Sequence, residues 1–233
     1  MAQACVTMKE RLNIPADDVN SLIFASIKVF LDRLYTSRIG IHMITNQHLV
    51  MYGYERQAPH NVGIIHPNCD LTSVLVDAMD ETTFYTENTY MVAPKVNIKM
   101  VSHGKETKEI PLCHLVPSHL FIIFNEILKN AMRATVEHHW DNKDDLPPVS
   151  VTICHANDDF TIKISDQGGG MDRESASKCF FYQYSTVPKH CSEKYLLGYG
   201  LPLARLYSRY FNGDLKVASY EVSSFNNFNE NNI

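Results

Sequence analysis

One predicted helix carries a carboxylate, an amide and a guanidinium on the same face. At the helical angle of 100° per residue, Glu126, Asn130 and Arg133 fall within about 60° of one another, and Lys129 flanks them. The carboxylate can accept a proton, the amide oxygen is a ligand suited to Mg²⁺, and the guanidinium suits phosphate. Taken alone, such a pattern is more often an ordinary solvated helix face, so it needs support from elsewhere in the chain.

Two glycine-rich turns supply that support. Asp166-Gln-Gly168-Gly-Gly170 follows an apolar segment, where a carboxylate can accept from an amine such as adenine N6 and glycine lets the backbone approach a flat ring or a phosphate. Gly198-Tyr-Gly200 precedes a predicted helix, whose exposed N–H groups and dipole favour phosphate. Each turn alone is equally compatible with a plain loop, and neither contains a dinucleotide or P-loop motif. Their order after the polar helix is what favours a nucleotide site.

The elements that must position these residues follow from periodicity. Apolar spacings of three and four predict helices over residues 19–51, with a possible break at Gly40, and over 70–90, 117–139 and 202–211. Alternation predicts strands over 96–100, 110–115, 149–153, 160–164 and 214–220. In the helix over 117–139, the apolar stripe is expected to pack against a sheet, and His119 at its start is expected to be structural. The stripe consists of Phe124, Leu128, Ala131 and Thr135.

This order of elements predicts an α+β fold. Residues 1–65 are expected to be the remnant of a helical bundle, because one or two amphipathic helices cannot bury their apolar face alone. Residues 66–222 are expected to form an α/β sandwich, a mixed sheet with helices on one face. Residues 223–233 are rich in Asn and are expected to be a disordered tail.

Composition excludes several classes of protein. Of 233 residues, 45% are apolar and 20% charged, as in ordinary globular proteins, and the net charge of −5 argues against general nucleic-acid binding. No apolar run approaches the ~20 residues of a membrane helix, so no membrane span is expected. The six cysteines form no C-x-x-C pair and fit a reducing compartment. No signal or transit peptide is visible at the start of the chain.

The order of these motifs resembles the ATP-binding GHKL fold shared by gyrase, the heat-shock-ninety chaperones, histidine kinases and MutL. The chain is most similar to the mitochondrial kinases of 2-oxo-acid dehydrogenases, above all pyruvate dehydrogenase kinase. Similar segments lie at residues 30–39, 46–48, 90–94, 116–120, 126–137, 164–170, 184–186 and 198–215. The string Lys129-Asn-Ala-Met-Arg-Ala-Thr135 is highly specific to these serine kinases and argues against an ATPase or phosphorelay module of the wider superfamily.

This resemblance implies a protein-serine kinase of the mitochondrial matrix that uses ATP and Mg²⁺ to phosphorylate, and so inhibit, pyruvate dehydrogenase. Glu126 would match the family's general base and would also contact ATP, and Asn130 would match the Mg²⁺ ligand. The other ATP-binding residues implied by the resemblance are Lys129, Arg133, Asp166, Gly168, Gly170, Ser185, Thr186, Gly198, Tyr199, Gly200 and Leu201. Implied partners are the E1 substrate and the E2 lipoyl domain of the dehydrogenase complex, and a second copy of the chain as a homodimer.

The chain also departs from the family pattern. It is expected to be truncated at both ends, which would impair docking on the lipoyl domain. Ile122 replaces a histidine that tunes the general base in pyruvate dehydrogenase kinases, and Leu196 replaces the first glycine of the second turn. Two alternatives therefore stay open: a nucleotide-binding remnant without kinase activity, and a relative of the branched-chain 2-oxo-acid dehydrogenase kinase.

Overall fold

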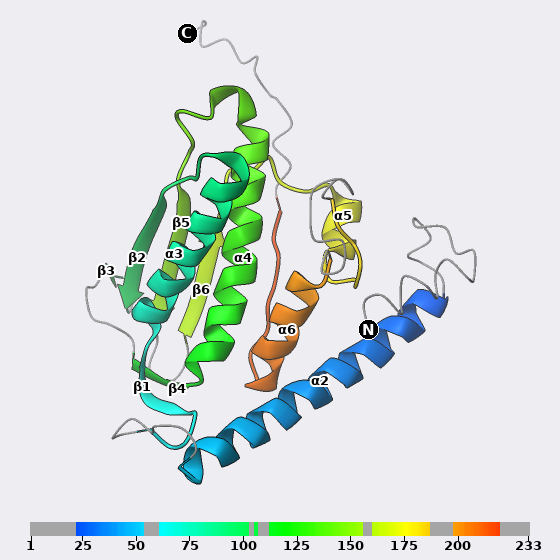
Figure 1. Cartoon of the computed structure of the whole chain (residues 1–233). Helices are drawn as coiled ribbons and strands as arrows, with labels where there is room; N and C mark the ends of the chain where they lie inside the picture. The colour runs from blue at the N-terminus through cyan, green and yellow to red at the C-terminus, as the bar shows by residue number, and fades with distance from the viewer. Residues whose placement is uncertain are drawn as a thin grey trace, which may run out of the picture.

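The computed structural model describes residues 22–53, 61–102, 105–106, 112–155, 160–186 and 198–219. Its helices are α2 (Leu22–Met51), α3 (Leu71–Tyr90), α4 (Pro117–His138), the 3₁₀ turn η1 (Trp140–Asn142), α5 (Arg173–Lys178) and α6 (Gly200–Tyr210). Its strands are β1 (His66–Asp70), β2 (Val96–Ser102), β3 (Lys105–Glu106), β4 (Leu112–Leu115), β5 (Val149–His155) and β6 (Phe160–Ser165) (Figure 1).

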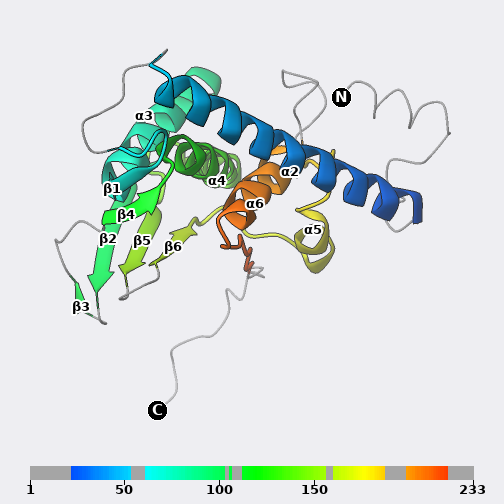
Figure 2. The same cartoon turned by 90° about the horizontal axis from the view of Figure 1, so that it is seen from below.

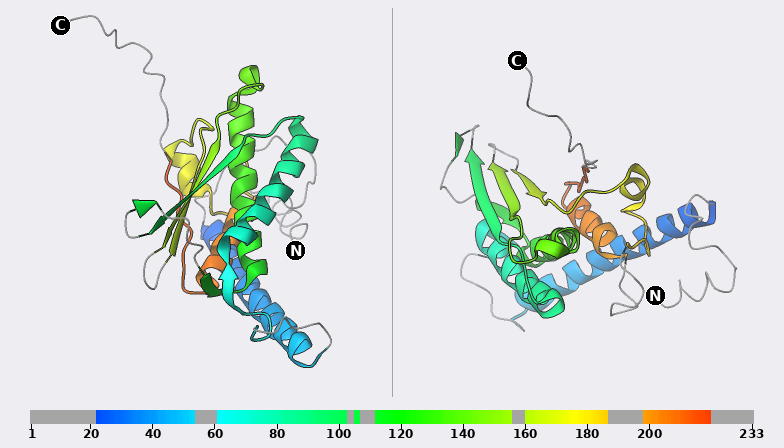
Figure 3. Two further views of the ribbon diagram at one scale, coloured as in Figure 1. Left: turned by 90° about the vertical axis from the view of Figure 1, so that its left-hand side faces the viewer. Right: turned by 90° about the horizontal axis from the view of Figure 1, so that it is seen from above.

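The main sheet is mixed, with strand order β3-β2-β5-β6. β2 and β5 are parallel, with Val96 opposite Val149, whereas β5 and β6 form the antiparallel hairpin that alternation predicts. β1 and β4 pair separately as a short antiparallel ribbon. Helices α3 and α4 lie together on one face of the main sheet (Figure 3). The predicted α+β fold is therefore confirmed.

The core lies between α3, α4 and this sheet. In β5, alternate residues point toward the helices and are fully buried, namely Val149, Val151 and Ile153. Opposite them, α4 buries the predicted stripe together with neighbours on the same face: Leu120, Phe124, Leu128, Ala131, Met132, Thr135 and Val136. This packing fixes the rotation of α4. Its polar residues are consequently turned away from the core.

Helix α2 runs unbroken for 30 residues, so the possible break at Gly40 does not occur. It lies across α6 (Figure 2). A Cβ at position 40 would stand 3.7 Å from the Tyr210 hydroxyl oxygen of α6, an ordinary van der Waals distance, so α2 and α6 are in contact there without a requirement for glycine. Neither α2 nor any other described helix combines the length and hydropathy of a membrane span.

The predicted strand over residues 214–220 is wrong for the part that is described. Residues 214–219 pair with no described strand. The Ser219 hydroxyl instead bonds to the backbone of Met171, accepting from its N–H at 2.6 Å and donating to its carbonyl at 3.2 Å.

Strand β1 and helix α5 were not predicted. Residues 110–111, 187–197 and 220–233 lie outside the described residues, and with them Leu196, the end of the predicted strand and the predicted disordered tail.

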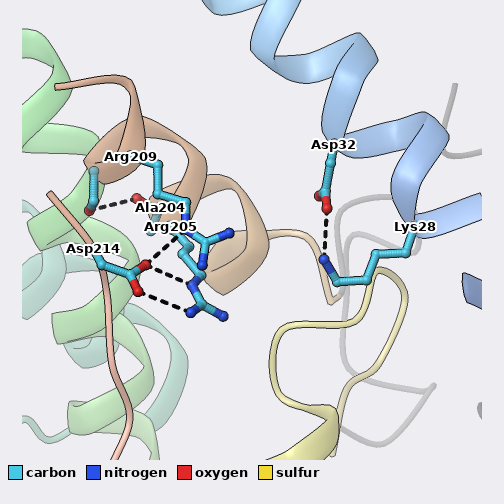
Figure 4. A network of polar contacts seen from close by, with 7 residues as sticks. Lys28, Asp32, Ala204, Arg205, Arg209 and Asp214 are labelled. Atoms are coloured by element: carbon cyan, nitrogen blue, oxygen red, sulfur yellow. Dashed lines mark hydrogen bonds and ion pairs between the residues drawn. The ribbon is translucent and has the colours of Figure 1, made fainter. Parts of the chain in front are cut away.

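Two guanidinium groups of α6 hold the start of this segment. Arg205 donates from Nε and Nη2 to the two carboxylate oxygens of Asp214 at 2.9 and 3.1 Å, and Arg209 Nε donates at 2.9 Å (Figure 4). The hydrogen bond from Arg205, aided by that from Arg209, holds the pKa of Asp214 well below its usual range. The ionised carboxylate is thus the form that the fold stabilises.

We expect Asp214→Asn to lower the melting temperature at pH 7, with a loss of roughly 1 kcal/mol because the side chains are partly exposed to solvent. The folded-state pKa is depressed, so this stabilisation is complete above the unfolded pKa of about 4 and is lost as the pH falls through the folded pKa. Thermal melts of both chains from pH 7 to pH 2 should show a difference that narrows in acid. A difference that widens as the pH falls contradicts the assignment. Asp77→Asn, at an exposed position on α3, is the control.

Candidate functional site

The Glu126 carboxylate lies directly against the second glycine turn. A Cβ built on Gly200 would overlap with Glu126 Oε2, so the carboxylate occupies the space that a side chain at position 200 would fill. Gly200 is also the first residue of α6, whose positive dipole end favours a nearby carboxylate. Glu126 Oε1 accepts a hydrogen bond from Lys129 Nζ at 2.9 Å, and both side chains are about one-third exposed. The structure thus brings a carboxylate, an ammonium group and a helix N-terminus together.

Arg133 and Asn130 occupy the next turns of the same face. Arg133 Nη2 donates to Thr186 Oγ1 at 3.2 Å, which joins α4 to the segment that follows Gln183. Its Nε is buried and has no hydrogen-bond partner among the described residues. Asn130 is half-buried, and its side chain makes no hydrogen bond to another described residue. The Asn130 amide oxygen is therefore not engaged by another described residue, whereas the two Arg133 donors are bonded to Thr186 and buried, respectively.

The first glycine turn also packs against α4. Asp166 Oδ1 accepts from the Gly168 N–H at 2.9 Å, which fixes the carboxylate at the end of β6. A Cβ on Gly168 would stand 2.5 Å from the Ala134 Cβ of α4, so the turn can pack this closely only with glycine. Gly170 takes a φ of +77°, a conformation natural to glycine. Ala134 follows Asn130 by about one turn of α4, so the backbone of the first glycine turn packs against α4 one helical turn beyond Asn130.

The second turn is tied to the segment that contains Ser185 and Thr186. The Gln183 N–H donates to the Gly198 carbonyl at 3.0 Å. Gly198 has a φ of +79°, and a Cβ there would stand 2.5 Å from the Tyr184 carbonyl oxygen. Leu201 follows in the first turn of α6. Each of the two turns contacts α4 or a segment bonded to it, so the predicted site residues converge on one helix.

One predicted residue points elsewhere. The Tyr199 side chain is only 3% exposed and packs toward α2, against Tyr35 and Tyr182. Only the backbone of Tyr199 therefore contributes to the ligand-facing side of the second glycine turn. The aromatic residues that pack against the Tyr199 ring were not predicted. No local sequence pattern indicates this contact, because Tyr182 and its hydrogen-bond partner Asp32 are 150 residues apart in the chain.

His119 is structural, as expected. It is buried, and its ring packs against Tyr207 and Phe211 at centroid distances of 4.8 and 5.5 Å. Burial, with the nearby His42, lowers its pKa. A neutral imidazole in this aromatic contact joins the start of α4 to α6. Ile122, one turn before Glu126, is half-buried.

Comparison with known proteins decides the family. A family model described as "Histidine kinase-, DNA gyrase B-, and HSP90-like ATPase" matches residues 115–227, which include α4 and both glycine turns. A second, "Mitochondrial branched-chain alpha-ketoacid dehydrogenase kinase", matches residues 1–66. The mitochondrial pyruvate dehydrogenase (acetyl-transferring) kinase of Drosophila melanogaster is 42% identical over 231 residues, or 95% of this chain. The chain belongs to the mitochondrial 2-oxo-acid dehydrogenase kinase family.

Other members of this family give the same result. The corresponding kinase of Ascaris suum is 40% identical over 228 residues, and isozyme 3 of Homo sapiens is 38% identical over 229 residues. Each alignment covers 95% of this chain but 55% of the relative. The chain thus spans about half the length of these dehydrogenase kinases, and its residues 115–227 are the part that matches the ATPase family model.

Proposed function

We propose that this chain is the nucleotide-binding and catalytic part of a mitochondrial protein-serine kinase. It transfers the γ-phosphate of ATP to a serine of the E1 component of pyruvate dehydrogenase and thereby inhibits that enzyme. The observation that carries the proposal is the contact between Glu126 and Gly200, which sets a carboxylate beside the turn suited to phosphate. The names of the relatives support both the substrate and the location in mitochondria.

Glu126 is proposed as the general base. A carboxylate next to the phosphate-binding turn can accept the proton of a serine hydroxyl as that oxygen attacks phosphorus. Lys129, whose Nζ lies 2.9 Å from the same carboxylate, adds positive charge beside the transferred group. Arg133 contributes a guanidinium with a buried, unpartnered Nε. Positioning and charge neutralisation are the main requirements of phosphoryl transfer.

We propose the remaining ATP contacts from the resemblance to the family. Asp166 anchors the adenine, and Gly168 and Gly170 allow its close approach. The phosphates are held by the backbone of Gly198, Tyr199, Gly200 and Leu201, with Ser185 and Thr186 alongside. Tyr199 takes part through its backbone, since its side chain is buried against α2.

Asn130 is proposed as the protein's Mg²⁺ ligand. Within the described residues, no three His, Cys, Asp or Glu side chains converge on one point, so a cage made by the protein alone is not expected there. The donor set fits Mg²⁺, which commonly takes one or two protein oxygens and completes its shell with phosphate and water. When bound, the ion neutralises phosphate charge. The Asn130 amide oxygen, one turn from Glu126, would orient it.

We further propose a division of the chain near residue 65. α2 ends before it, and β1 opens the part that carries the sheet. Phe30, Ile41 and Ile44 of α2 are exposed, which supports residues 1–65 as part of a larger helical bundle. Residues 66–222 form the kinase domain, and 223–233 a tail. The proposed partners of the whole protein are the E2 lipoyl domain, on which it would dock, and a second copy of the chain, with which it would form a homodimer.

Calorimetry with Mg-ATP tests the ligand assignments. The wild-type chain should bind, and Asn130→Ala should weaken binding at least about tenfold, because a contact to a charged group contributes roughly 1.5–3 kcal/mol. Asn88→Ala, which removes an exposed amide on α3, should bind like the wild type. Equal affinities for Asn130→Ala and wild type would remove Asn130 from the metal site.

A further inference from the structure

A buried hydroxyl joins α2 to the segment that precedes the second glycine turn. Tyr182 Oη donates to Asp32 Oδ1 at 2.6 Å, and Lys28 Nζ lies 2.7 Å from the other oxygen of Asp32 (Figure 4 shows the Lys28–Asp32 pair). Burial, together with the bond to Asp32, raises the pKa of Tyr182 far above its usual range. The hydroxyl therefore stays protonated and donates at all physiological pH values.

An aromatic cluster surrounds this bond. The Tyr35 and Tyr182 rings are stacked with centroids 5.8 Å apart, and the Tyr199 ring lies 5.5 Å from Tyr182. Tyr182, Tyr199 and Leu31 are 6%, 3% and 1% exposed. The cluster thus combines residues of α2 with one residue from each side of segment 187–197.

The residue after Tyr182 carries the contact to the turn. Gln183 has a φ of +64°, a conformation that is strained for a residue other than glycine and persists only where the surroundings hold it. Its N–H donates to the Gly198 carbonyl at 3.0 Å, and its Nε2 lies 3.2 Å from Tyr199 Oη. Gly198 and Tyr199 directly precede α6. A shift of Tyr182 must therefore move the turn that Glu126 contacts.

We propose that Asp32 and Tyr182 are positioning residues for ATP binding, through which α2 holds the second glycine turn in its ligand-binding conformation. Neither side chain touches the nucleotide in this account. Their effect passes through Gln183 to Gly198. This inference rests on the proposed ATP site. It also couples two parts of the chain to each other. Helix α2 lies in the part matched by the dehydrogenase kinase model, and the second glycine turn lies in the part matched by the ATPase model.

Mg-ATP calorimetry on a set of matched variants tests the inference. Tyr182→Phe keeps the ring and removes the hydroxyl, and it should raise the Kd about fivefold, within the range typical of a lost bond to a charged group. Asp32→Ala should do the same, the double variant should be no worse than either single one, and Asp32→Asn, which keeps an acceptor oxygen, should recover part of the affinity. Tyr90→Phe is the control, since it removes a hydroxyl that donates to Glu137 at 2.8 Å between α3 and α4.

A second readout does not depend on ATP. In the unliganded chain, Tyr182→Phe should speed hydrogen exchange at the amides of Gln183 and Leu203, which donate to the carbonyls of Gly198 and Tyr199, while Tyr90→Phe should not. If Tyr182→Phe binds Mg-ATP like Tyr90→Phe, or lowers only the melting temperature, the inference is overturned. A folded wild-type chain that binds no Mg-ATP overturns the proposed function instead, and unchanged exchange at these amides would still overturn the inference on its own.

Discussion

Glu126→Gln should bind Mg-ATP as the wild-type chain does and transfer phosphate to serine about 10²- to 10⁴-fold more slowly, the range expected for loss of a general base. The amide matches the carboxylate in size, so the contact with Gly200 is retained, but it cannot accept the serine proton. The measurement is incorporation of γ-phosphate into the E1 component, with calorimetry alongside to report binding.

A control on the same helix separates this effect from general loss of charge. Glu137→Gln removes a carboxylate from the far end of α4, where it accepts from Tyr90, and should leave the transfer rate within about twofold of wild type. A Glu126→Gln chain as active as Glu137→Gln would remove Glu126 from the role of base. Loss of ATP binding in Glu126→Gln would indicate a role in holding the nucleotide.

Gly198→Ala should abolish tight Mg-ATP binding. The backbone there has a φ of +79°, which costs roughly 1–2 kcal/mol for alanine, and the added methyl would lie 2.5 Å from the Tyr184 carbonyl oxygen. Backbone atoms cannot rotate away as a side chain can, so Gly198 must separate from Gln183 and Tyr184. The measurements are the Kd for Mg-ATP and the melting temperature of the unliganded chain.

The chain contains a matched control for this substitution. Gly53 has a φ of +78°, and a Cβ there would meet no atom of the described residues within 4 Å. Gly53→Ala therefore carries the conformational cost without the overlap, and its affinity for Mg-ATP should equal that of the wild type. Equal affinities for Gly198→Ala and Gly53→Ala would show that the close packing of the second turn is not required for nucleotide binding.

The parts of the site that could be predicted depend on local periodicity. The spacing of Phe124, Leu128 and Ala131 determines which face of α4 is buried, and so places Glu126 and Asn130 on the opposite face. The β5–β6 hairpin likewise follows from alternation within a short stretch of chain. For the same reason, the two glycine turns could be placed at the end of a strand and the start of a helix.

Features that depend on distant contacts could not be predicted. β1 pairs with β4 across more than 40 residues, and its sequence His-Pro-Asn-Cys-Asp has little strand character. The alternation after Asp214 resembles a strand, yet the described segment is held by Arg205, Arg209 and the Met171 backbone in place of a ladder. Tertiary contacts override local propensity in both cases.

A phosphorylation assay tests the proposed kinase activity. The purified chain is incubated with Mg²⁺, γ-labelled ATP and the E1 component of pyruvate dehydrogenase, and the labelled residue is then mapped. We expect phosphoserine on E1 with the wild-type chain, and at least about 10²-fold less in the same time with Glu126→Gln. The contradicting result is a folded chain that binds Mg-ATP but leaves no phosphoserine, under conditions in which the Drosophila relative labels E1. That outcome would identify the chain as a nucleotide-binding protein without kinase activity.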